Sequence, residues 1–164
     1  MRLPPKRRDE SILTRPMVLT IFTTAGFFVV VMMTLLLGME NGWWLRDTGG
    51  TPARSSPELT YWQASVFFTV YVFFQVWNEI NCRSLVPEVS GFRGLPRNPV
   101  FLGIIAAIVL GQVLIVTFGR REAFEVDPIG PLAWLAIAAF TVTVLLYAEG
   151  VRRLRLALRR RSGV

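Results

Sequence analysis

Four long apolar segments dominate the chain, and stretches rich in polar residues, glycine and proline separate them. Each segment has about 20 residues almost free of Asp, Glu, Lys and Arg, and a helix of this length crosses the roughly 30 Å hydrocarbon core of a bilayer. The pattern predicts an all-α integral membrane protein with four transmembrane helices arranged as two helical hairpins. The predicted spans cover residues 17–39, 59–82, 98–119 and 129–149.

The positive charges outside these segments predict how the helices are oriented. The basic arm 1–16, the loop between the second and third spans and the tail 151–164 together carry 14 of the 18 Lys and Arg residues. Loops rich in Lys and Arg stay in the cytoplasm. We therefore expect a multi-pass protein of the plasma or inner cell membrane, with a bundle over residues 17–150 and both termini cytoplasmic (N-in, C-in).

The composition excludes several functional classes. The chain has no histidine and a single cysteine, Cys82, which excludes imidazole catalysis, an internal disulfide and CxxC metal or redox motifs. Its net charge is +7, but the arginine clusters adjoin apolar segments, so we interpret them as topology signals that meet anionic lipid headgroups and not as a nucleic-acid surface. Val151, Leu154 and Leu158 fall on one helical face, so the tail is expected to continue the fourth span as an amphipathic turn or two.

Polar residues in the second span are the main candidates for chemistry. At 3.6 residues per turn, Tyr71, Gln75, Asn78 and Cys82 fall on one face of a helix. One interpretation makes Gln75 and Asn78 oxygen donors near a cation path, since hard cations prefer oxygen ligands. The other makes them partners in interhelical hydrogen bonds, because an unpaired amide in lipid costs several kcal/mol. The residues alone leave both interpretations open.

The third span carries a packing signal. Gly103, Ala107 and Gly111 recur every four residues, which allows a neighbouring helix to approach closely, and Gln112 beside them is expected to act as a tether. The first, third and fourth spans contain no ionisable side chain at depth. A coupled transporter normally needs such a group, which argues against autonomous transport by this chain.

Longer runs of sequence resemble a known family. The run FFQVWNEINCRSL resembles the eighth transmembrane helix of calcium-type P-type ATPases, especially of the plasma-membrane class. GLPRNPVF and QVLIVTFG continue the match, and PPKRRDESIL is similar to the loop between helices six and seven of bacterial members. These runs occupy Phe73–Leu85, Gly94–Phe101, Gln112–Gly119 and Pro4–Leu13. The four predicted spans would then correspond to helices seven to ten.

The resemblance implies a part of a pump and not a complete one. P-type ATPases phosphorylate an aspartate in an Asp-Lys-Thr-Gly-Thr motif and bind ATP in a large cytoplasmic domain, and this sequence contains neither. The implied role is the C-terminal membrane-anchoring and supporting bundle, present as a fragment, a split-gene product or a truncated reading frame. Alone it should be no enzyme and should hold no cofactor, whereas the parent pump would use ATP, Mg²⁺ and Ca²⁺. Its implied partner is the remaining N-terminal part of the pump.

The resemblance also implies roles for individual residues. Gln75 aligns with a glutamate that ligates calcium in two-site, reticulum-type pumps, which makes it a weak contact of the calcium path with Asn78 as its neighbour. The charged residues of the arm are expected to contact the cytoplasmic stalk and phosphorylation domain. These are Arg7, Arg8, Asp9 and Glu10.

Two alternative functions remain from the sequence. The chain could be a free-standing membrane scaffold or regulatory subunit that binds a complete pump. It could also be a small ion channel or exporter that acts as an oligomer. Stable binding to a pump that has its own last four helices would favour the first alternative, and ion flux in liposomes abolished by Gln75→Leu would favour the second.

Overall fold

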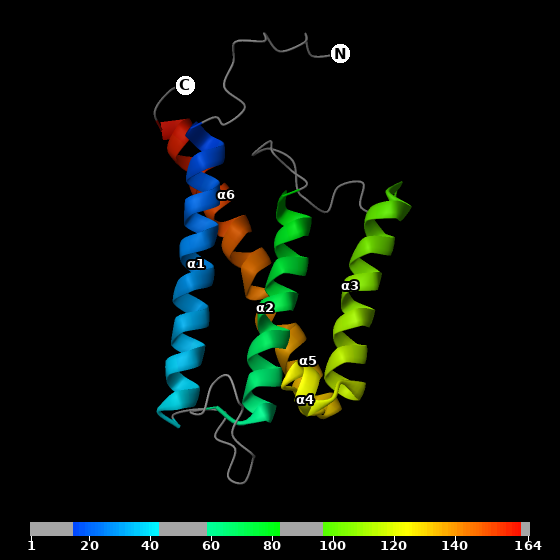
Figure 1. The fold of residues 1–164 in the computed structure, drawn as a ribbon. Helices are drawn as coiled ribbons and strands as arrows, with labels where there is room; N and C mark the ends of the chain where they lie inside the picture. Colours follow the sequence, from blue (N-terminus) through cyan, green and yellow to red (C-terminus); the bar gives the residue numbers. More distant parts are fainter. Residues whose placement is uncertain (1–14, 43–58, 83–96, 162–164) are drawn as a thin grey trace.

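The computed structural model of the chain describes residues 15–42, 59–82 and 97–161. The elements within these residues are α-helices (Figure 1). They are α1 (Arg15–Glu40), α2 (Tyr61–Cys82), α3 (Pro99–Phe118), α4 (Arg121–Phe124), α5 (Pro131–Thr141) and α6 (Thr143–Arg161). Each of the first three helices extends over one apolar segment, α5 and α6 share the fourth, and the short α4 lies in the loop between α3 and α5.

Local sequence signals account for where the helices begin. Thr60 and Gln63 form a capping box at the start of α2: the Thr60 backbone N–H donates to Gln63 Oε1 (2.9 Å), and the Gln63 backbone N–H donates to Thr60 Oγ1 (3.2 Å). Asn98 caps α3, and its Oδ1 accepts from the Phe101 N–H at 3.1 Å. Prolines open α3 and α5, where the missing N–H has no helical partner to lose.

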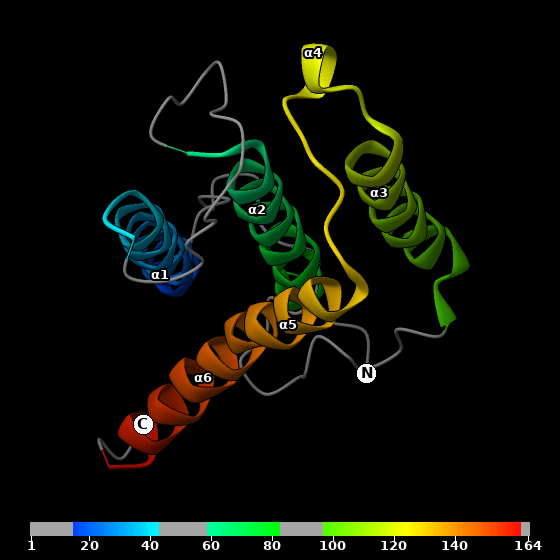
Figure 2. The ribbon, with the colours of Figure 1, turned by 90° about the horizontal axis from the view of Figure 1, so that it is seen from below.

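The central position in the bundle belongs to α2. Figure 2 shows α1 and α3 on either side of α2, while α5 and α6 run across a third side. Accordingly, α2 contacts each of the other four long helices. The beginning of α1 and the end of α6 lie at the same end of the bundle (Figure 1).

The fourth apolar segment forms a nearly continuous helix that is longer than the sequence indicated. Val142, between α5 and α6, keeps helical backbone angles (φ −57°, ψ −21°), and its N–H still donates to the Ala138 carbonyl at 3.3 Å. The helix then continues to Arg161, so the tail adds about three helical turns beyond Glu149 and not one or two. The two helices have 11 and 19 residues, which corresponds to about 45 Å at a rise of about 1.5 Å per residue.

Within the described residues the fold is consistent with an all-α membrane protein, and three helical stretches there are long and apolar enough to cross a bilayer. These stretches are Met17–Glu40, Pro99–Phe118 and Pro131–Val151. The central helix, α2, is not among them, because its glutamines, asparagines and Glu79 lower its mean hydropathy. Its neighbours cover much of its surface, so the helix does not need the fully apolar exterior of a helix that faces lipid on most sides.

Candidate functional site

The buried side of α2 carries two hydroxyl groups in the N-terminal half of the helix. Ser65 and Thr69 are both fully buried. Ser65 Oγ donates to the Tyr61 carbonyl (2.8 Å) and accepts from the Asp127 backbone N–H (2.7 Å). Thr69 Oγ1 accepts from Gln112 Nε2 (3.0 Å), which confirms the predicted tether between α3 and its neighbour. Two side chains one turn apart thus join α2 to α3 and to the loop before α5.

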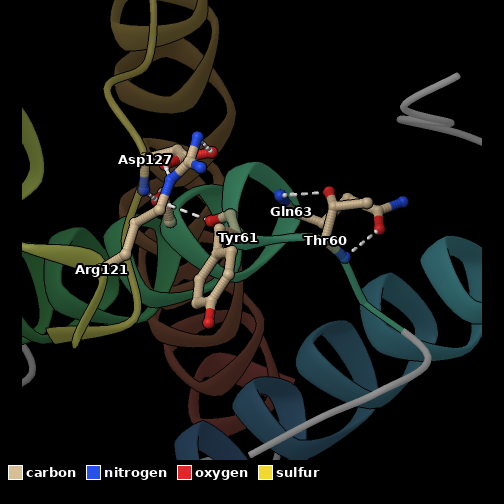
Figure 3. Close-up of polar contacts among 6 residues, drawn as sticks. Thr60, Tyr61, Gln63, Arg121 and Asp127 are labelled. Carbon is tan, nitrogen blue, oxygen red and sulfur yellow. Dashed lines mark hydrogen bonds and ion pairs between the residues drawn. The ribbon is translucent and has the colours of Figure 1, made fainter. Parts of the chain in front are cut away.

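An ion pair joins Arg121 and Asp127 within that loop, beside the start of α2 (Figure 3). The Arg121 guanidinium donates twice to the Asp127 carboxylate, through Nε and through a terminal nitrogen that lies 2.9 Å from Oδ2. It also lies 5.7 Å from the centre of the Tyr61 ring, a cation–π arrangement. The hydrogen bond to Asp127, followed by the charge of that carboxylate, raises the pKa of Arg121. The arginine therefore stays charged throughout the range in which the pair can form.

Deeper in the bundle, aromatic rings of α1 and α5 pack against Phe74 of α2. Phe74 has an exposed fraction of 0%. Its ring stacks on that of Phe28 at 5.3 Å between centroids and meets those of Phe27 (6.2 Å) and Phe140 (5.9 Å) at an angle. These contacts bring α1 and α5 against the same side chain of α2.

Two long-range hydrogen bonds support this packing. Trp77 Nε1 donates to Thr141 Oγ1 (2.9 Å), which joins α2 to the end of α5. Thr141 Oγ1 also lies 2.7 Å from the Ile137 carbonyl in the preceding turn, so a buried hydroxyl has partners on both sides. Tyr147 donates to the Thr23 carbonyl (3.1 Å) and joins α6 to α1. The polar groups at these crossings are therefore satisfied within the bundle.

The remaining side of α2 is open, and it carries the predicted ion-path face. Tyr71 is 47% exposed and Cys82 is also exposed, while Gln75 and Asn78 are half-buried. In Figure 2, α1, α3 and the α5–α6 pair lie on three sides of α2, and no other described long helix covers the fourth. The structure thus places the four predicted residues on one face, but no other helix among the described residues covers it fully.

In a membrane, the amide groups on this face of α2 need hydrogen-bond partners. Amide groups left without partners in hydrocarbon cost several kcal/mol, whereas a face covered by another helix can satisfy them. Among the described residues, no group of three or more His, Cys, Asp or Glu side chains is placed to hold a metal ion. Gln75 and Asn78 therefore do not form a carboxylate-rich cation site together with the described part of the chain.

The small-residue face of α3 does not pack against another described helix. Gly103 and Ala107 are exposed, Gly111 is half-buried, and a Cβ at either glycine would meet nothing within 4 Å. The buried residues of α3 are Gln112 and Val116, near its C-terminal end. The predicted close helix–helix approach therefore stays a prediction for a partner other than the described residues.

Four predicted site residues lie outside the described residues, and two residues that make polar contacts in the structure were not predicted. The arm residues Arg7, Arg8, Asp9 and Glu10 lie outside the described residues. Sequence reasoning missed the polar contacts of Ser65 and Asp127. The available signal was the spacing of Ser65 and Thr69, four residues apart on the side of α2 opposite Tyr71.

Comparisons with known proteins agree on one group. The family model described as "Cation transporting ATPase, C-terminus" matches residues 1–154. Plasma membrane calcium-transporting ATPase 3 of Homo sapiens is 30% identical over 131 residues, covering 80% of this chain and 10% of that protein. Probable calcium-transporting ATPase 6, plasma membrane-type, of Oryza sativa subsp. japonica is 31% identical over 146 residues, covering 89% of this chain and 13% of the relative. The chain thus spans a small part of the length of the curated relatives it matches.

Proposed function

The chain belongs to the family of cation-transporting ATPase C-termini, and on this basis we propose that it is the membrane-anchoring and supporting bundle of a calcium-transporting P-type ATPase. The curated relatives named above are plasma-membrane calcium pumps. In this proposal the chain alone neither hydrolyses ATP nor moves ions. It supplies a scaffold against which the N-terminal part of a pump is held in the plasma membrane.

The open side of α2 is the observation that carries the proposal. Phe68 and Tyr71 are exposed on it, and Gln75 and Asn78 lie half-buried beside them in a helix that its neighbours otherwise enclose. A central helix with amides on its one uncovered face is suited to receive another membrane helix, which would exclude lipid and offer partners to the amides. We propose that the remaining membrane helices of the pump dock there, with Gln75 at the edge of the ion path and Asn78 as its neighbour.

The supporting role follows from how the rest of the bundle is held. The hydrogen bonds from Gln112 to Thr69 and from Trp77 to Thr141 join α2 to α3 and α5, and the ring contacts of Phe74 add α1. Packed cores of this kind resist continuous deformation. The bundle can therefore remain fixed while other helices of a pump change their positions.

In this proposal α2 also crosses the membrane, which gives four spans and places both termini in the cytoplasm. Cys82, exposed at the end of α2, offers a direct test because it is the only cysteine. In intact cells, a membrane-impermeant maleimide should leave Cys82 unlabelled and should label it only after permeabilisation. In a Cys82→Ser background, Ala123→Cys in α4 should show the reverse pattern. Labelling of both positions from the outside would contradict the four-span topology.

Assembly with a pump tests the function itself. A plasma-membrane calcium pump truncated after its sixth helix should regain calcium-dependent phosphorylation from ATP when it is co-expressed with the full chain. Phe68→Ala and Gln75→Leu, on the open side of α2, should reduce both co-purification and this recovery. The matched control is Leu135→Ala, because Leu135 is 70% exposed on α5, away from the open side. It should leave both readouts unchanged.

Three outcomes would contradict the proposal. Calcium-dependent ATP hydrolysis by the purified chain alone would give it an enzymatic activity of its own. Equally strong binding to a complete pump, with its own last four helices in place, would favour the scaffold or regulatory function. Equal loss of assembly in the Leu135→Ala control and in Phe68→Ala would show that the open side of α2 is not the docking surface.

A further inference from the structure

A carboxylate lies in the last turn of α2. Glu79 is three residues before Cys82, where the helix ends, and no basic residue lies in that turn. The C-terminal end of a helix carries a partial negative charge, which disfavours a carboxylate and favours a cation. The end of α2 therefore lacks the positive charge that the helix dipole and Glu79 both call for.

Glu79 has no ionic partner among the residues that the structure describes. In contrast, Asp127 pairs with Arg121 in the loop before α5. On α6, Glu149 pairs with Arg153. Of these three carboxylates, Glu79 is the one on the central helix, and it is half-buried, so neighbouring groups already displace part of its hydration.

The register of α2 places Glu79 along the open side. Phe68, Gln75 and Glu79 follow one another at spacings of seven and four residues, so they form one ridge of the helix. A helix that covers this ridge removes the remaining water from Glu79. An unpaired carboxylate in such a contact opposes association, whereas a basic group opposite it satisfies the charge.

We propose that the helix that docks on the open side of α2 brings a lysine or arginine against Glu79. This inference rests on the proposed docking of the remaining helices of a pump, and it adds the chemistry of the partner. The partner is apolar beside Phe68, hydrogen-bonding beside Gln75 and basic beside Glu79. The ion pair also fixes the register of docking, because sliding the partner by one helical turn leaves both charges unpaired.

Glu79→Gln keeps the shape of the side chain and removes its charge, and the proposal gives its two measurable effects opposite signs. In the full chain alone, the substitution should leave the midpoint of unfolding by sodium dodecyl sulfate unchanged or raise it, because an unfavourable charge leaves the helix end. Assembly is measured in calcium-free mixed micelles with a plasma-membrane calcium pump truncated after its sixth helix. There the apparent Kd should rise at least about ten-fold.

The matched control is Glu40→Gln. Glu40 also lies in the last turn of a helix, α1, but it is exposed and lies at the other end of the bundle from Glu79 (Figure 1). This control should change the apparent Kd by less than about two-fold. A stronger perturbation, Glu79→Lys, should abolish assembly, and replacing one basic residue of the truncated pump by glutamate should restore it.

The outcomes separate the ion pair from the docking on which it rests. If the unmodified chain does not bind the truncated pump, the docking is refuted and the ion pair with it. If the unmodified chain and Glu79→Gln bind equally well, the docking stands and the ion pair is refuted. Arg83 follows Glu79 by four residues and lies outside the described residues. A less stable chain with unchanged assembly in Glu79→Gln would assign Glu79 to a pair within the chain and would also overturn the proposal.

Discussion

Replacing Phe74 by alanine should destabilise the isolated chain far more than the same replacement of Phe68. Both side chains lie on α2, six residues apart, so helix propensity and chemistry are matched. Phe74 has an exposed fraction of 0%, whereas Phe68 is 39% exposed on the open side. The comparison therefore isolates the contribution of packing against α1 and α5.

The expected magnitude can be worked out from the contacts. In a bilayer, moving the phenyl ring from the core to the lipid changes the free energy little, because the lipid is as apolar as the core. What is lost is close packing: three ring contacts at about 0.5–1 kcal/mol each, and a cavity penalty of about 1–2 kcal/mol if the site collapses only in part. The free energy of unfolding should fall by about 3 kcal/mol for Phe74→Ala. For Phe68→Ala, whose ring faces lipid or detergent, the change should be below about 1 kcal/mol.

Reversible unfolding in mixed micelles, titrated with sodium dodecyl sulfate and followed by tryptophan fluorescence, measures both values. Trp77 lies one turn from Phe74 and its indole contacts α5, so its emission reports separation of these helices. A cavity-filling Phe74→Leu should recover a substantial part of the loss. Equal destabilisation by Phe74→Ala and Phe68→Ala would refute the assignment of α2 as the packed centre with one open side.

Three further tests concern polar contacts of α2 and of the loop beside it. Gln112→Leu and Thr69→Val, combined in a double-mutant cycle in micelles, should give a coupling energy of about 0.6 kcal/mol, and a value near zero would mean that the contact does not hold α3. Trp77→Phe should lower the free energy of unfolding by about 1 kcal/mol more when residue 141 is the native threonine than when it is replaced in Thr141→Val. With the threonine present, the substitution leaves a buried hydroxyl without its hydrogen-bond donor. Arg121→Gln should lower stability only slightly, and the loss should shrink in about 0.5 M salt, since the arginine side chain is 56% exposed. A salt-independent loss would instead point to its cation–π contact.

The helices themselves could be predicted from the sequence. The helices follow local features of the sequence closely. These features are the four charge-poor segments, the threonine and glutamine spaced as a capping box, and the prolines at helix starts. The family could also be recognised, because runs such as FFQVWNEINCRSL are specific without any coordinates. Gln112 was identified as a tether because a lone amide in an apolar helix needs a partner.

The assignment of faces required the tertiary structure. Periodicity placed Tyr71, Gln75 and Asn78 on one side of a helix, but only the positions of α1, α3 and α5 decide that this side is the uncovered one. For the same reason, spacing alone did not identify Thr69 as the partner of Gln112, 43 residues away, or show that the glycine face of α3 lacks a described neighbour. Helix formation depends on residues within a few turns, so the sequence by itself determined it. Burial depends on which helices meet across long separations along the chain, and in an apolar environment many faces are equally suited to packing until their partners are in place.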